Sequence, residues 1–211
     1  MWPDSTETHE LLIRAEGGEH SAVNLLMERH RQSLRQMVQL RMDRVISQRV
    51  DASDIVQEVL LEASQRLTDY MKDPRLPFHL WLRQLAKDQL IDTHRRHRVA
   101  QRRSADREQS LVQGGDGDRS SLDLVAQLRD HELTPAAATL RKEFQQRFYQ
   151  ALAQLEEDDR EIVLMRHIEQ LSNSEVAQAL GLSQPAAGMR HLRALRRLRE
   201  ILGEATSLPG G

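Results

Sequence analysis

Residues 51–62 read Asp-Ala-Ser-Asp-Ile-Val-Gln-Glu-Val-Leu-Leu-Glu, with carboxylates recurring every three or four residues. At a helical repeat of about 3.6 residues, four carboxylates fall within an arc of about 80°. They are Asp51, Asp54, Glu58 and Glu62. A separate apolar arc, suited to facing a core, carries Val56, Leu60, Ala63 and Leu67. The stretch therefore predicts a helix with one buried face and one acidic face.

A basic cluster follows further along the chain, with no carboxylate between its first and last member. It consists of Arg95, Arg96, Arg98, Arg102 and Arg103. An acidic face and a basic cluster on one small domain predict two partners of opposite charge, although the net charge of the whole chain is only −2.

The composition favours helices. The chain has 211 residues, which suits one large domain or two small ones, with 29% charged residues but only 3% aromatic ones. The absence of cysteine excludes disulfides and thiolate metal sites. The N-terminus lacks a signal pattern, and no apolar run approaches the ~20 residues that cross a bilayer. We therefore expect a soluble, cytoplasmic protein without a membrane partner.

Apolar periodicity predicts an all-α chain of two small helical domains. The first contains two helices within 8–46, broken at Gly17-Gly18, then helices at 51–71 and 78–98 around a proline-containing loop at 73–77. The second contains helices at 136–155, 158–168, 173–180 and 184–202.

The segment between the two domains is acidic. Seven carboxylates oppose three arginines over residues 104–135, which also hold a glycine-rich breaker at 114–118. This composition predicts a flexible linker, with one short helix at 121–130. We place the domains at 1–103 and 138–203, the linker at 104–137 and a tail at 204–211.

Residues 171–183 have the pattern of a helix-turn-helix. Ser172 and Glu175 have the spacing of a capping box, Gly181 can take the left-handed conformation that ends a helix, and Ser183 can cap the next helix, with Pro185 in its first turn. These features together predict the motif whose second helix enters the DNA major groove.

The second helix of this motif is basic on one side. We expect the other side to be apolar, through Met189, Leu192, Leu195 and Leu198. The candidate DNA contacts are Ser183, Gln184, Ala186, Ala187, Arg190, His191, Arg193 and Arg197. The alternative interpretation is an ordinary amphipathic helix with a solvated basic face.

These motifs and their spacing resemble those of bacterial RNA polymerase sigma factors of the sigma-seventy family, in the compact extracytoplasmic-function (ECF) group. The resemblance covers roughly residues 8–103 and 138–202. It is carried by Gly18–Ala22, by Asp51–Val59, by the run from Pro77 to Arg96, and by Leu155, Arg160 and Glu161 with the helix-turn-helix.

The resemblance implies a division of roles. Polymerase docking would involve Asp51, Asp54, Gln57 and Glu58, unless this face is simply solvated. Contacts with the downstream promoter element would involve Tyr70, Lys87, Asp88, Arg95, Arg96 and Arg98. We expect Phe78 and Trp81 to belong to the hydrophobic core. The chain departs from the family pattern at Asp88, often asparagine, and at residues 186–189, where Gly188 lies inside a helix.

The resemblance further implies an initiation factor that binds core RNA polymerase and promoter DNA and helps to open the duplex. Family members are often held by an anti-sigma protein, which is therefore a candidate partner. The acidic linker would thread through polymerase channels, or would serve as a solvated tether. Two other hypotheses remain open: a helix-turn-helix regulator that is not a polymerase subunit, and a protein-interaction module.

The sequence contains no pattern typical of an enzyme. His9-Glu10 is not followed by a second histidine at the spacing of a zinc protease, and there is no phosphate-binding glycine loop. His94 and His97 lie among arginines, which repel metal cations. We therefore expect no catalytic site, metal, cofactor or small-molecule substrate.

Overall fold

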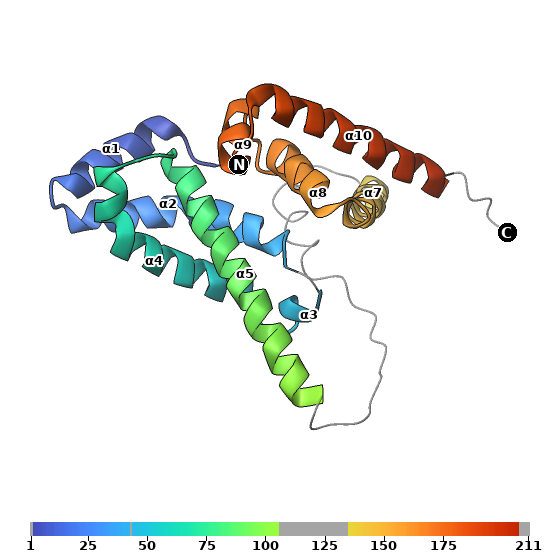
Figure 1. Cartoon of the computed structure of the whole chain (residues 1–211), viewed down its shortest axis with the longest axis horizontal. Helices are drawn as coiled ribbons and strands as arrows, with labels where there is room; N and C mark the ends of the chain where they lie inside the picture. The colour runs from blue at the N-terminus through green and yellow to red at the C-terminus, as the bar shows by residue number, and fades with distance from the viewer. Residues whose placement is uncertain (1, 43, 106–134, 207–211) are drawn as a thin grey trace. The chain divides into compact units, whose positions relative to one another are not determined.

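The computed structural model describes residues 2–42, 44–105 and 135–206, without the side chains of 44–45, 98–105, 135–142, 145 and 204–206. The chain divides into two compact units, Met1–Asp118 and Arg119–Gly211. Every regular element within the described ranges is a helix (Figure 1), which confirms the all-α prediction. Most of the predicted linker, including the proposed helix at 121–130, lies outside the described residues, as do 207–211 of the tail.

Within its described residues, the first unit contains five helices. They are α1 (Ser5–Glu16), α2 (His20–Gln39), α3 (Arg44–Ser47), α4 (Ala52–Lys72) and α5 (Phe78–Ala105). Helix α5 extends through the arginine cluster and continues through the first two residues of the predicted linker. The helices α2, α4 and α5 pack against one another, while α1 packs mainly on α2.

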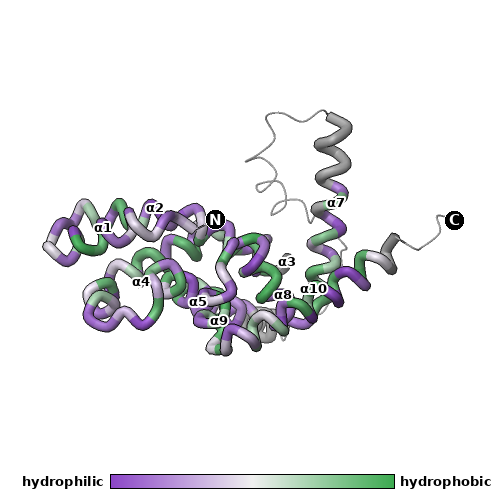
Figure 2. The backbone as a smooth tube through the Cα atoms, turned by 90° about the horizontal axis from the view of Figure 1, so that it is seen from above, coloured by the Kyte–Doolittle hydropathy of each residue, from purple (hydrophilic) through white to green (hydrophobic). Residues whose placement is uncertain are grey.

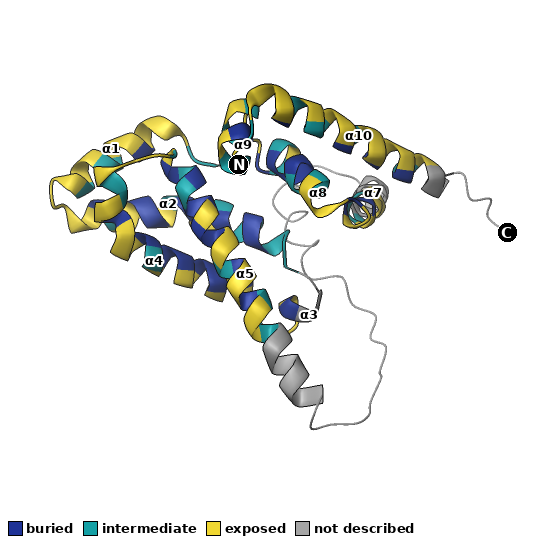
Figure 3. Ribbon diagram, in the orientation of Figure 1, coloured by how far each residue is buried: buried dark blue, intermediate teal, exposed yellow. Residues whose placement is uncertain are grey.

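The core of the first unit is built from one stripe of each packed helix. In α4 the buried stripe includes Ile55, Val56, Val59, Leu60 and Ala63. The apolar face predicted for this helix is therefore the face that packs into the core. It meets side chains of α2 and α5 that include Leu26, Leu34, Phe78, Leu82 and Leu85. Figure 2 shows the resulting alternation of hydrophobic and hydrophilic residues along these helices, and Figure 3 the matching alternation of buried and exposed ones.

The end of α2 differs from the prediction. The apolar pattern suggested a helix continuing beyond Met42, but α2 ends at Gln39 and a separate short helix follows. The last turn is closed by Arg41, whose Nη1 donates to the Met37 carbonyl at 3.0 Å, and by the Met42 N–H, which donates to the Val38 carbonyl at 3.1 Å. No glycine or proline marks this end, so the sequence offered no breaker there.

The second unit contains α7 (Pro135–Ala153), α8 (Glu157–Val163), the π-helical turn η1 (Leu164–Ile168), α9 (Asn173–Leu180) and α10 (Gln184–Thr206). The single helix predicted at 158–168 therefore widens in its last turn, where the Glu169 N–H reaches back to the Leu164 carbonyl at 3.0 Å. The turn is followed by Gln170 with a φ of +58°. Helix α10 packs against α7, α8 and α9.

No helix in the described ranges combines the length and apolar character needed to cross a membrane.

Candidate functional site

The acidic face of α4 is exposed at the four positions that the resemblance assigns to docking, Asp51, Asp54, Gln57 and Glu58. Asp51 also has a structural role, because its carboxylate accepts the Ser53 N–H at 2.6 Å and caps the helix. This hydrogen bond keeps the pKa of Asp51 below its usual value. The face is less uniformly acidic than expected at its far end, where Arg66 pairs with Glu62 at 2.7 Å.

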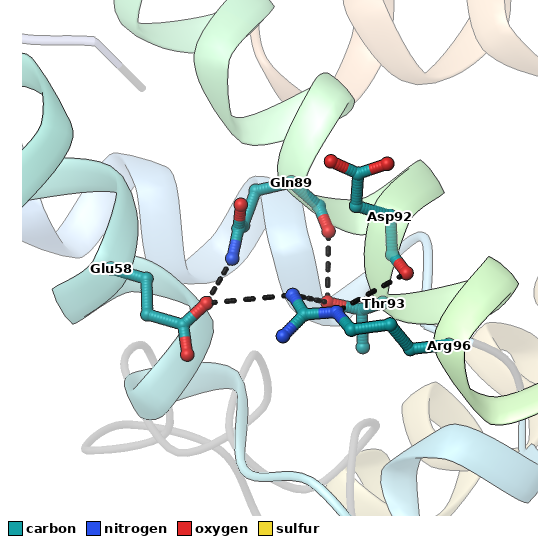
Figure 4. A network of polar contacts seen from close by, with 5 residues as sticks. All are labelled: Glu58, Gln89, Asp92, Thr93 and Arg96. Atoms are coloured by element: carbon teal, nitrogen blue, oxygen red, sulfur yellow. Dashed lines mark hydrogen bonds and ion pairs between the residues drawn. The ribbon is translucent and has the colours of Figure 1, made fainter. Parts of the chain in front are cut away.

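Glu58 connects the acidic face to the basic helix α5 (Figure 4). Its carboxylate accepts a hydrogen bond from the Gln89 amide and lies 3.7 Å from the Arg96 guanidinium. Arg96 is further held by the Asp92 carbonyl at 3.4 Å and the Thr93 hydroxyl at 3.5 Å. Both charged side chains are more than half exposed, so the ion pair itself contributes little to stability. The acidic face of α4 therefore meets α5 at Gln89 and Arg96.

The other downstream-element candidates on α5 point elsewhere. Lys87, Asp88 and Arg95 are exposed, and at helical pitch they share an arc of about 100° with exposed Ile91 inside it. Arg96 lies outside this arc, on the side of α4. The side chain of Arg98 is outside the described residues, as are those of Arg102 and Arg103.

Tyr70 is packed within the first unit. Its ring stacks on Trp81 with centroids 4.5 Å apart and meets Phe78 edge-on, and its hydroxyl donates to the Leu76 carbonyl at 3.0 Å. Burial raises the pKa of its phenol. Phe78 is only 4% exposed, which confirms the expectation that it is core; Trp81 is half-buried. Tyr70 thus anchors the loop before α5 and offers less of its ring to a base than the sequence suggested.

The helix-turn-helix has the caps that were predicted. The Ser172 hydroxyl accepts the Glu175 N–H at 3.2 Å, and the Glu175 carboxylate accepts the Ser172 N–H at 2.7 Å. Gly181 is left-handed with φ +63°, and the next N–H, of Leu182, returns to the Ala177 carbonyl at 2.9 Å. Ser183 then caps α10 by accepting the Ala186 N–H at 3.3 Å.

The predicted DNA contacts on α10 divide into three groups. Exposed positions are Ser183, Gln184, Ala186, Arg193 and Arg197. Two half-buried side chains are held by α8 and η1: Arg190 pairs with Asp158 at 3.1 Å, and His191 lies with its Nε2 2.9 Å from Nε2 of His167. Burial and the nearby His167 lower the pKa of His191. Ala187 is fully buried, so it is a core residue and not a base contact.

The expected apolar side of α10 was also partly wrong. Met189 and Leu192 are 59% and 50% exposed, whereas the buried positions include Ala187, Ala194, Leu198 and Ile201. The packing face is therefore rotated relative to the prediction, because small alanines let α10 lie close to its neighbours. Sequence reasoning also missed His167, which no local pattern connects to α10.

The residues described in the structure contain no group of three or more histidine, aspartate or glutamate side chains arranged to hold a metal ion.

Comparison with known proteins agrees with these features. Residues 145–198 match the family model described as Sigma-70, region 4. The ECF RNA polymerase sigma-E factor of Haemophilus influenzae is 26% identical over 170 residues, covering 81% of this chain and 82% of that protein. The RNA polymerase sigma-H factor of Pseudomonas aeruginosa is 26% identical over 178 residues, covering 82% of each.

Two solved structures share the fold. CnrH, in complex with the cytosolic domain of CnrY, superposes with a TM-score of 0.60 at 23% identity, covering 95% of this chain and 99% of that one. The sigma factor RpoE from Bartonella quintana gives 0.52 at 21% identity, covering 85% and 93%. The match to Sigma-70, region 4 and the sigma-factor relatives that span most of the chain together support an ECF factor of the sigma-70 family.

Proposed function

We propose that the two units divide the work of a sigma initiation factor, which binds core RNA polymerase and directs it to promoters. The observation that carries this proposal is that one unit has an exposed acidic face on α4 and the other unit has a capped, basic helix-turn-helix. A plain regulator needs the second feature and not the first. In this scheme residues 1–103 dock on polymerase and engage the downstream element, residues 138–203 read the upstream element, and 104–137 join them.

The docking surface we propose consists of Asp54, Gln57 and Glu58, with Asp51 at its edge as the helix cap. A complementary basic surface on the polymerase would be steered to it by long-range attraction. Because Glu58 also touches Gln89 and Arg96, docking here would act directly on Arg96, one of the residues we propose for the downstream element.

For the downstream element we propose Lys87, Asp88 and Arg95, with Arg96 where α5 meets the acidic face of α4, Arg98 further along α5 and Tyr70 as the support of the loop. The cationic members would bind phosphates and make the affinity salt-dependent. For the upstream element we propose Ser183, Gln184, Ala186, Arg190, His191, Arg193 and Arg197. Gln184 and His191 carry the donor and acceptor groups that read base edges, while the arginines supply charge.

We propose that the chain acts in the cytoplasm and has no catalytic activity of its own, because the chemistry of transcription belongs to the polymerase. The Bartonella quintana RpoE structure is a complex with the anti-sigma factor NepR. It supports an anti-sigma protein as a further partner of this chain, competing for the surfaces that polymerase and DNA use.

The docking surface is tested by reversing its charge. Asp54→Lys is the cleaner variant, because Glu58→Lys also places a second cation beside Arg96. We expect Asp54→Lys to weaken binding to core polymerase at least about 10-fold. Glu28→Lys makes the same charge change on the exposed side of α2, where Glu28 pairs with Arg31 at 2.7 Å, and should bind as the unmodified chain does. Normal polymerase binding by a folded Asp54→Lys variant would exclude this surface.

A further inference from the structure

Gly188 lies inside α10, five residues into a helix that runs from Gln184 to Thr206. Glycine is the least favourable residue in a helix interior apart from proline. Spacings of four and three residues place Gln184, Gly188 and His191 on one face. A glycine therefore occupies the middle of the face that we propose to read DNA.

The packing of the protein does not require this glycine. A Cβ atom added at Gly188 would have a single close neighbour, Oδ1 of Asn173 at 3.9 Å, which is ordinary van der Waals contact. Gly181, by contrast, needs its positive φ for the turn. The close approach of α10 to its neighbours takes place at Ala187 and Ala194, which are fully buried. The fold thus gains nothing from the missing side chain at position 188.

The side chains that border Gly188 are held from outside α10. The Gln184 amide donates to the Ser174 hydroxyl at 3.2 Å, and the Asn173 amide donates to the Gln184 carbonyl at 2.9 Å, so α9 fixes one border. On the other border, His167 of η1 holds His191 through their Nε2 atoms, 2.9 Å apart. Bare helix backbone remains between two oriented polar side chains, which is an arrangement suited to close approach by a ligand.

We infer that Gly188 is the point at which duplex promoter DNA comes against the backbone of α10, so closely that a Cβ would stand in its way. This inference rests on the proposed function of α10. Gly188 then contributes to promoter binding because it has no side chain. Gln184 and His191, on either side of it, supply the polar groups.

The test compares two glycines of the same helix in the full-length chain. Gly203 also lies in α10, and a Cβ there would meet nothing within 4 Å, so Gly203→Ala is a matched control for Gly188→Ala. Each alanine should raise the melting temperature by a few degrees, because alanine is the better helix former. The binding assay uses the polymerase complex and a duplex that carries the upstream element of a promoter used by the unmodified chain. Binding should weaken about 10-fold or more for Gly188→Ala. The same binding should be unchanged for Gly203→Ala.

Single base-pair changes in the duplex identify the contact. If the affinity lost in Gly188→Ala depends on the identity of one base pair, a base edge lies against Gly188. If the affinity loss is equal on every sequence, the sugar–phosphate backbone lies there. Both results support the inference. A stabilised Gly188→Ala variant that binds as tightly as Gly203→Ala would overturn it. Failure of the unmodified chain to direct initiation would instead overturn the proposed function itself.

Discussion

Acid should destabilise the first unit through one buried histidine, His30. Its side chain is fully buried in α2, 5.1 Å from Phe78 and 6.1 Å from Trp2 between ring centroids. The Thr8 hydroxyl donates to the Asp4 carbonyl at 2.8 Å, so its oxygen is free to accept from Nε2 of His30 at 3.3 Å. This assigns the neutral ring a proton on Nε2, and Nδ1 has no hydrogen-bond partner.

Protonation would place a second N–H, with no acceptor, and a positive charge in this apolar site. Burial, with the nearby charges of His79 and Arg29, lowers the pKa of His30 from 6.5 to about 4. The unfolded chain therefore binds more protons than the folded one between these values, and stability falls as the pH falls through them. The loss is about 2 kcal/mol between pH 7 and pH 5, and about 3 kcal/mol by pH 4.

Urea unfolding at pH 7, 6, 5 and 4 measures this dependence. Other groups also titrate in acid, so the informative quantity is the difference between the unmodified chain and His30→Leu, which cannot take up the proton. Between pH 7 and pH 5, the free energy of unfolding of the variant should fall by about 2 kcal/mol less than that of the unmodified chain. His9→Leu, which removes an exposed histidine of α1, should keep the full pH dependence. An equal acid loss in His30→Leu and the unmodified chain would refute the assignment.

Three further predictions follow from the local geometry. Ser172→Ala should lower the free energy of unfolding of the second unit by about 1 kcal/mol in thermal melts, because it removes the hydroxyl that accepts the Glu175 N–H; Ser172→Thr should restore most of the loss. Gly181→Ala should lower the free energy of unfolding by about 1–2 kcal/mol, because φ is +63° there and a side chain would be strained. An unchanged melting temperature would contradict this strain. Lys87→Ala and Arg95→Ala should each flatten the slope of log affinity against log salt by about one for promoter binding, whereas an unchanged slope would place them away from phosphates.

The caps and the turn of the helix-turn-helix could be predicted because they depend on neighbours in sequence. Ser172, Glu175 and Gly181 satisfy or end the helix that contains them, so their residue types and spacing were sufficient. The same holds for the buried stripe of α4, which is a simple helical period.

The errors concern contacts between distant elements. The buried face of α10 is the one along which α8 can approach most closely. The small side chains of Ala187 and Ala194 allow this approach, whereas the larger Met189 and Leu192 are exposed. Hydrophobicity alone ranks these residues the other way. The stacking of Tyr70 on Trp81 and the contact of Glu58 with Arg96 likewise join separate helices, and no local pattern indicates them.

Run-off transcription with purified core polymerase tests whether this chain is an initiation factor. A library of promoter fragments would be transcribed with and without the full-length chain. We predict new initiation at defined start sites only when the chain is present, and loss of that initiation with Asp54→Lys. No initiation, together with salt-sensitive binding of duplex DNA by the chain alone, would contradict this claim and favour a regulator that is not a polymerase subunit.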